Sequence, residues 1–159
     1  MSVAFTKEQD AESAAADLPD RPISPHPNLV TPTGLAALDD ALARARAAYA
    51  EAAASEDVQA DRTPMARATR DLRYFAVRRA SAQLIEPGAN DGVIHFGASV
   101  TVLREDGRRQ VWRIVGEDEA DPAKGSVSYL SPLARTLLGK RVGDETQLAG
   151  GEMEIVAVE

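Results

Sequence analysis

Three carboxylates lie close together in the segment SEDVQADRTP, residues 55–64, between two alanine-rich runs. They are Glu56, Asp57 and Asp61. Hard divalent ions such as Mg²⁺ prefer oxygen ligands and keep several waters, so one or two carboxylates can hold an ion whose other ligands come from a partner or its phosphates. Asp57 and Asp61 are therefore candidate ligands of a shared Mg²⁺, in a site that this chain would not complete alone. The alternative is a solvated turn, because acids cluster by chance in an acidic protein.

The sequence has no motif of a self-contained catalytic centre. It contains no GxxxxGK, no HExxH and no glycine-rich dinucleotide turn, and it has no cysteine. A nucleophilic triad would need Ser or Thr with one of the two histidines, His26 or His95. We interpret His26, which stands between prolines, as a bystander, and His95, in a predicted strand, as a packing residue. The sequence predicts that the chain is not an enzyme and has no cofactor of its own.

Two helices are expected to position the acids. Thr31-Pro32 and Thr63-Pro64 each combine an N-cap threonine with proline at the first helical position, a standard helix start. Apolar residues then recur at spacings of three and four, which is a heptad seam. The first seam is Leu35, Leu38, Leu42, Ala45, Tyr49 and Ala52; the second, interrupted by Arg79 and ending near Leu84, is Met65, Ala68, Leu72, Phe75 and Ala82.

Each seam is too narrow to fold alone, so the two helices are expected to bury one another. The result is an antiparallel coiled-coil hairpin with arms of about 24 residues, or about 36 Å at 1.5 Å per residue. The three acids then lie at its far end.

Charge divides unevenly between the two helices. Residues 31–61 hold six acids against two arginines, whereas residues 62–86 hold six arginines against two acids. One reading is that the helices pair charges across their flanks, as coiled coils commonly do. The functional reading is that Arg62, Arg67 and Arg70 face a nucleic-acid backbone. The net charge of −7 argues against a nucleic-acid interface over the whole surface.

The remaining sequence divides into a leader and a small domain. Residues 1–30 hold five acids and four prolines, which predicts a disordered or extended leader; residues 31–86 form the arm. Residues 87–159 alternate with period two and are expected to form an antiparallel sheet with one short helix at SPLARTLLG, so the fold class is α+β. The strands are expected at VIHF, SVTVL, QVWRIV, SVSYL, TQL and MEIVAV, with a hairpin turn at Glu105-Asp106-Gly107. The absence of cysteine, signal peptide and long apolar run favours the cytoplasm.

Several of these motifs together resemble the Gre family of bacterial transcription elongation factors, over about residues 30–158. The arm opens with VTPTGL and returns through LRYF. The domain motifs are FGA at residues 96–98, EDG at 105–107, RIVG at 113–116, SPLA at 131–134, LGK at 138–140 and VGD at 142–144.

The resemblance implies a fold, a partner and an activity. In the family, an FKBP-like C-terminal domain docks at the rim of the secondary channel of RNA polymerase, and the coiled coil reaches down that channel. Its acidic tip helps to hold a catalytic Mg²⁺, so that the polymerase cuts the 3′ end of backtracked RNA. By this resemblance Arg62 and Arg67 lie near the nascent RNA. Tyr129, Ser131, Pro132 and Leu133 are expected to contact the polymerase, and the factor is expected to be a monomer.

Two departures from the family pattern open an alternative. The family tip reads approximately Gly-Asp-x-x-Glu-Asn, whereas this chain has SEDVQAD, and each helix is about two turns shorter, or about 10 Å of reach. Gre relatives with altered arms occupy the channel and regulate or inhibit transcription without stimulating cleavage. Outside this class, an FKBP-like domain suggests a prolyl isomerase, for which Phe96, Trp112 and Tyr129 are few aromatic residues, and the arm alone suggests an adaptor.

Overall fold

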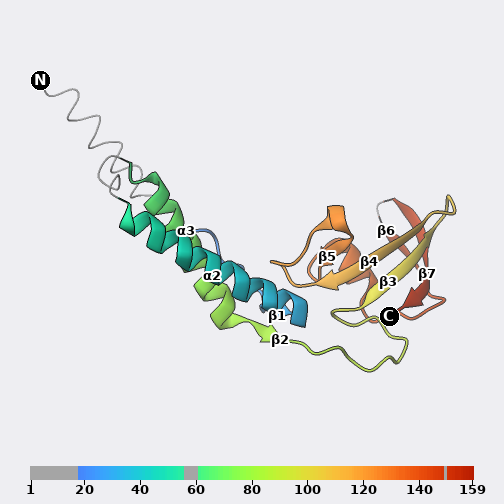
Figure 1. The fold of residues 1–159 in the computed structure, drawn as a ribbon. Coiled ribbons are helices and arrows are strands. Elements are labelled where there is room, and N and C mark those ends of the chain that lie inside the picture. The colour runs from blue at the N-terminus through green and yellow to red at the C-terminus, as the bar shows by residue number, and fades with distance from the viewer. Residues whose placement is uncertain (1–17, 56–60, 149) are drawn as a thin grey trace, which may run out of the picture. The chain divides into compact units, whose positions relative to one another are not determined.

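The computed structural model describes residues 18–55, 61–148 and 150–159 (Figure 1). The chain divides into two compact units, one of Met1–His26 with Leu38–Ser81 and the other of Pro27–Ala37 with Ala82–Glu159. The first turn of the first long helix therefore belongs with the sheet, whereas the sequence boundary at residue 31 placed it with the arm. No helix in the described ranges is both long and apolar enough to cross a membrane.

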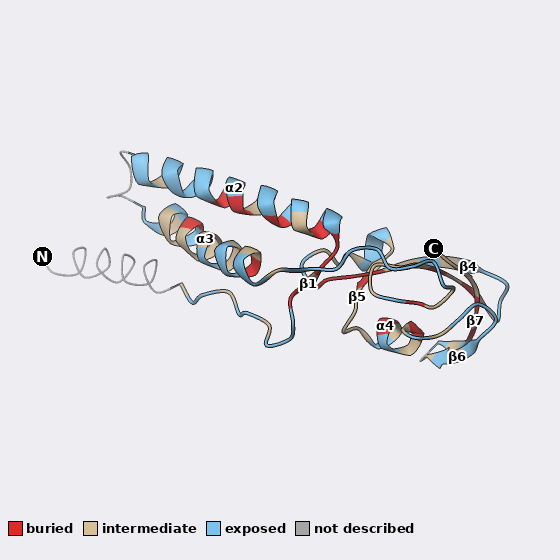
Figure 2. Ribbon diagram, turned by 90° about the horizontal axis from the view of Figure 1, so that it is seen from below, coloured by how far each residue is buried: buried red, intermediate tan, exposed pale blue. Residues whose placement is uncertain are grey.

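The arm consists of α2 (Pro32–Ala54) and α3 (Thr63–Ser81). The two helices lie side by side in Figures 1 and 2, and the buried positions of α2 face α3. Leu38, Leu42 and Ala45 of α2 and Ala68 of α3 are buried, as the heptad seam predicts. Tyr49, the next seam position, is 37% exposed, so the fully buried part of the seam in α2 ends near Ala45.

The starts of the two helices are capped differently. The hydroxyl of Thr31 accepts a hydrogen bond from Gly34 N at 3.0 Å, which confirms Thr31 as the N-cap of α2. At α3 the prediction was wrong, because Thr63 is already helical and Asp61 supplies the acceptor, taking a hydrogen bond from Thr63 N at 2.9 Å. Arg62 occupies the N-cap position, since its carbonyl accepts the first bond of the helix, from Ala66 N. Asp61, one residue earlier, caps the helix start in the sense that its carboxylate satisfies the free N–H of the first helical residue.

The end of α3 also differs from its prediction. The helix stops at Ser81, and Gln83–Leu84 forms β2, which pairs in parallel with β1 (Leu29–Val30). Backbone hydrogen bonds from Gln83 N to Asn28 O and from Ile85 N to Val30 O, at 2.8 and 2.9 Å, hold the pair. The end of the leader is therefore a strand and not disordered chain.

The second unit is built on a five-stranded sheet with order β5-β4-β3-β7-β6. The strands are β3 (Ser99–Arg104), β4 (Arg109–Val115), β5 (Ser126–Ser128), β6 (Glu145–Leu148) and β7 (Gly151–Val158). Four of these strands pair antiparallel, and the turn between β3 and β4 lies where Glu105-Asp106-Gly107 predicts it. The sheet is nevertheless mixed, because β5 runs parallel to β4. Between them the chain crosses back through residues 116–125, which include the short 3-10 helix η2 (Pro122–Lys124).

The first predicted strand of this unit is absent from the described structure. Of VIHF, only Val93 makes an isolated bridge, to Arg141, and His95 is exposed. His95 Nε2 lies 3.2 Å from the Asp91 carboxylate, so it is paired at the surface and is not a packing residue. The apolar alternation that suggested a strand comes mainly from Ile94, which is 1% exposed and belongs to the core.

The core lies between the sheet and α4 (Pro132–Leu137). Along β3, burial alternates so that Val100 and Val102 are fully buried, as a strand with one face on the core requires. The helix α4 is the predicted one, with Ser131 as its N-cap. The buried cluster comprises Ile94, Val100, Val102, Ile114, Val127, Ala134, Leu137, Met153 and Ile155.

Candidate functional site

The tip of the arm holds one described acid, Asp61. Glu56 and Asp57 lie outside the described residues. The hydrogen bond from Thr63 N, together with the hydroxyl of Thr63, lowers the pKa of Asp61 below its ordinary value. The carboxylate is thus anionic at neutral pH and already serves as the cap of α3.

The described part of the tip does not by itself fit a divalent cation. Among residues 18–55, 61–148 and 150–159, no three His, Asp or Glu side chains come together as a metal-binding group. One carboxylate that also accepts a backbone hydrogen bond leaves most ligand positions of Mg²⁺ to waters or a partner.

The arginines of α3 have different environments. Arg62 and Arg67 are exposed near the start of the helix, as the nucleic-acid reading requires. Arg70 is partly buried, and its Nε lies 3.8 Å from a carboxylate oxygen of Asp71. The three predicted residues therefore differ in exposure. Arg62 and Arg67 are open to solvent, whereas Arg70 lies against its own helix.

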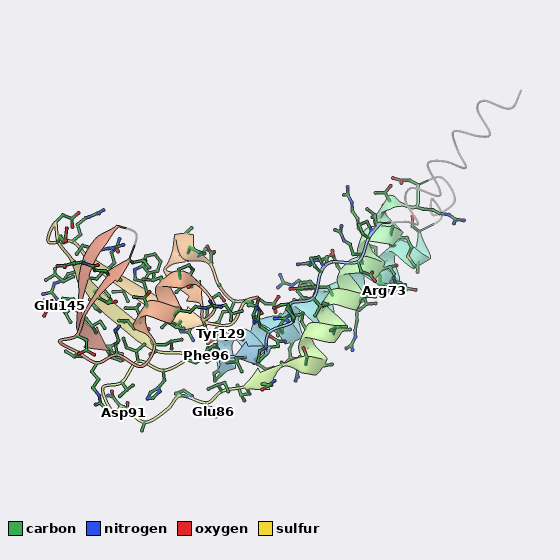
Figure 3. The ribbon with its side chains drawn as sticks, turned by 180° about the vertical axis from the view of Figure 1, so that it is seen from behind. Arg73, Glu86, Asp91, Phe96, Tyr129 and Glu145 are labelled. Carbon is green, nitrogen blue, oxygen red and sulfur yellow. The ribbon has the colours of Figure 1, made fainter. Side chains whose placement is uncertain are left out.

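Other arginines of α3 are used within the fold. Arg79 forms an ion pair with Asp39 of α2, which is the flank pairing expected of a coiled coil. Arg78 is only 2% exposed, and sequence periodicity does not single it out. Arg73, labelled in Figure 3, pairs with Asp20 of the leader at 3.3 Å.

The corner between β5 and α4 holds the four residues predicted to contact a polymerase. Tyr129 donates a hydrogen bond through its hydroxyl to Pro27 O at 2.6 Å, and its ring meets that of Phe96 edge to face at 5.8 Å (Figure 3). Ser131 accepts a hydrogen bond from Ala134 N, and Leu133 packs against the core. Pro132 is the exposed member of the group. The surface at this corner is thus built on residues that also stabilise the domain.

Sequence reasoning missed a polar cluster at the start of α2. The Thr31 hydroxyl donates to both carboxylate oxygens of Glu119, at 3.0 and 2.7 Å, and Arg113 Nη1 donates to Glu119 at 3.2 Å. The Glu119 side chain is 13% exposed, so these are bonds to a largely buried carboxylate beside a helix N-terminus, which its charge stabilises. Thr31 was predicted as a cap, but Glu119 lies in an acidic loop with no signal that distinguishes it from its neighbours.

Glycines allow the backbone to approach closely at this cluster. A Cβ on Gly116 would lie 2.2 Å from Leu29 O, and one on Gly34 would lie 2.8 Å from Glu119 Oε2. The first contact involves backbone, which cannot move away as a side chain can. Gly116 is the last residue of the RIVG motif.

The second unit, in which α4 packs on the mixed sheet, contains the segment that matches a known family. Residues 89–159 match the family model described as the C-terminal domain of the transcription elongation factors GreA and GreB. This match assigns residues 89–159 to the C-terminal domains of the Gre family.

Its relatives include GreB of Neisseria meningitidis serogroup B, which is 41% identical over 96 residues, covering 57% of this chain and 59% of the relative. GreA of Alkalilimnicola ehrlichii is 47% identical over 85 residues, covering 50% of this chain and 54% of the relative. The chain thus spans little more than half the length of the curated relatives it matches. Among solved structures, GreA factor homolog 1 (Gfh1) of Thermus thermophilus aligns with 84% of this chain and 99% of its own, at 25% identity and a TM-score of 0.40.

Proposed function

We propose that this chain is a Gre-like transcription elongation factor that binds RNA polymerase at the rim of the secondary channel and regulates elongation. The observation that carries the proposal is the family match of residues 89–159, the domain to which the resemblance assigns docking. An FKBP-like domain and a coiled-coil arm entering the channel belong to the same proposal. In it the chain is an accessory factor, a cytoplasmic monomer without a catalytic centre of its own.

The docking surface in this proposal is the corner of Tyr129, Ser131, Pro132 and Leu133. Pro132 is the exposed residue there, so its substitution should affect a partner more than the domain. We expect Pro132→Glu to weaken competition with an established Gre factor for core polymerase, with its unfolding temperature close to that of the parent. Lys124→Glu, at an exposed position of η2 outside this corner, is the control. Unchanged competition by Pro132→Glu would remove this corner from the docking surface.

The action at the channel has two candidate forms. In the first, Asp57 and Asp61 share a Mg²⁺ with the polymerase near the 3′ end of the RNA, and backtracked RNA is cleaved. In the second, the arm occupies the channel and regulates or inhibits transcription without cleavage. The second is favoured by the use of Asp61 as a helix cap and by the lengths of α2 and α3, 23 and 19 residues, or about 35 and 28 Å.

Transcript cleavage in stalled, backtracked complexes with Mg²⁺ separates the two forms. The variants are Asp57→Ala, Asp61→Asn and Asp61→Ala. Asparagine keeps a side-chain acceptor for Thr63 N and removes the charge, whereas alanine removes both. Cleavage that Asp57→Ala and Asp61→Asn abolish supports metal sharing; polymerase binding without cleavage supports the channel-occupying form. No competition for polymerase by any variant or by the parent would contradict the proposed function itself.

A further inference from the structure

The leader is attached to the arm at Asp20 and Arg21. The Asp20 carboxylate lies 3.3 Å from Arg73 Nη1, and Arg21 Nη1 lies 3.5 Å from a carboxylate oxygen of Asp71. The guanidinium carbon of Arg21 lies 3.8 Å from the centre of the Tyr74 ring, within cation–π distance. These contacts join two consecutive leader residues to Asp71, Arg73 and Tyr74 of α3, and all lie in one compact unit.

The part of α3 at these contacts and just before them has the composition of a single-stranded nucleic-acid surface. Arg67, Arg70 and Arg73 follow one another at spacings of three, so they lie near one another along the helix. Tyr74 and Phe75 adjoin them, with ring centres 5.1 Å apart in an edge-to-face arrangement. Proteins that bind single strands without sequence preference combine cations for the backbone with aromatic rings on which bases stack.

The two leader residues occupy both kinds of contact. Asp20 places an anion against Arg73, where a phosphate would bind. Arg21 places a flat guanidinium over Tyr74, where a base would stack, and its centre lies 5.2 Å from the Phe75 ring. A nucleic-acid strand and the leader therefore cannot hold Arg73 and Tyr74 at the same time.

We propose that residues 18–26, which we call the strap, are an intramolecular competitor that covers a single-stranded RNA surface formed by Arg73, Tyr74 and their neighbours on α3. The strap holds the surface closed through contacts that are individually weak at an exposed site. It can therefore be displaced by a strand that supplies several phosphates and bases together. The inference goes beyond the proposed function and does not require polymerase.

A double substitution that releases the strap without changing the net charge tests the competition between the strap and RNA. The double variant Asp20→Asn with Arg21→Gln removes one negative and one positive charge, so the net charge stays at −7. Its matched control, Asp40→Asn with Arg46→Gln, makes the same exchange at exposed positions of α2. Binding of a short fluorescein-labelled oligouridylate to the full chain is measured by anisotropy. We expect the strap variant to bind about three- to tenfold more tightly than the parent and the control to match the parent.

Two further measurements locate the effect. Adding Arg73→Gln to the strap variant should abolish the gain in affinity, because Arg73 is part of the uncovered surface. Since the chain has no cysteine, Ile23→Cys can carry a single nitroxide label on the strap, at a residue that is 43% exposed. Its electron paramagnetic resonance spectrum should sharpen in the strap variant and on adding oligouridylate to the parent.

Each other result contradicts the proposal. A label that is equally mobile in parent and strap variant would show that the strap is not held on α3. A label that is released without a gain in affinity would show that the strap covers no RNA surface. The same conclusion follows if oligouridylate binds none of the variants, or if the gain persists without Arg73.

Discussion

At the scale of single residues, side chains that the sequence offers as ligands are used within the fold. Asp61 caps α3, and Tyr129 holds the backbone of Pro27. Glu119, which the sequence does not distinguish, collects hydrogen bonds from Thr31 and Arg113 in a largely buried position. Residue type alone therefore separates functional acids from structural acids poorly in this chain, because the same carboxylate group can cap a helix or accept buried hydrogen bonds.

The Glu119 cluster makes a stability prediction. Replacing Glu119 by alanine leaves the Thr31 hydroxyl and Arg113 without their acceptor, and hydrogen bonds to charged groups each contribute about 1.5–3 kcal/mol. We expect Glu119→Ala to lower the free energy of unfolding by about 2 kcal/mol, measured by urea denaturation. Glu145→Ala, at an exposed residue of β6, should change it little. Equal effects of the two substitutions would contradict a special role for Glu119.

The contacts of Asp91 predict how its contribution to folding stability depends on pH. The backbone N–H of Val93, and then His95, lower the pKa of Asp91 below its ordinary value. A carboxyl group with a lowered folded-state pKa stabilises the fold above its unfolded pKa, which is near 3.9, and this contribution is lost as the pH falls through the folded pKa. The stability difference between parent and Asp91→Ala should therefore be present at about pH 5 and shrink as the pH falls below about 4. A difference that grows as the pH falls from about 4 would contradict the assigned sign.

At the scale of elements, sequence signals worked where local chemistry decides the structure. Thr31-Pro32 starts α2, Ser131-Pro132 starts α4, and Glu105-Asp106-Gly107 lies in the turn between β3 and β4. Each signal depends on hydrogen bonds or backbone angles within a few residues, which the sequence contains.

The sequence signals for secondary structure failed where contacts with distant residues decide the structure. Gln83–Leu84 leaves the helical pattern because Leu29–Val30 offers a parallel partner 54 residues earlier in the chain. The parallel direction of β5 and the loss of a strand at VIHF are likewise set by pairing with other segments. At the candidate site, Asp61 was found from sequence, but its role as a cap was not, because the threonine beside it gave an equally good start signal.

The close approach of β1 to the loop after β4 leads to a prediction about the stability of a variant at Gly116. Alanine at Gly116 would place its Cβ 2.2 Å from Leu29 O, so β1 must move or the loop must distort. Overpacking of this kind costs about 1–3 kcal/mol, which we expect to see as a lower free energy of unfolding for Gly116→Ala. Gly88→Ala is the control, since its Cβ would meet only His95 at 3.9 Å. A Gly116→Ala variant as stable as this control would show that the close approach is not required.

At the scale of the whole molecule, the chain is divided by contacts and not by the order of its segments. Pro27–Ala37 belongs with Ala82–Glu159, and the rest of α2 belongs with α3 and the strap. A leader, an arm and a domain in series, as the sequence suggests, would place residues 27–30 in the leader. The structure instead uses them as part of the sheet-containing unit, where Asn28, Val30 and Thr31 are buried.

Two truncations distinguish the division by contacts from a leader, an arm and a domain in series. Removing residues 1–26 deletes the strap and leaves Pro27, β1 and their contacts in place. Removing residues 1–30 also deletes the acceptor of the Tyr129 hydroxyl, the β1 partner of β2, and Val30, which is 4% exposed.

Burial of a valine side chain contributes about 1.5–3 kcal/mol and each hydrogen bond about 1 kcal/mol, so we expect the longer truncation to lose about 3–5 kcal/mol more stability than the shorter one. The unfolding of both is followed through Trp112, which lies in the second unit. If the arm truly began at residue 31, the two truncated chains would unfold at the same denaturant concentration, because residues 27–30 would then be an appendage with no share in the fold.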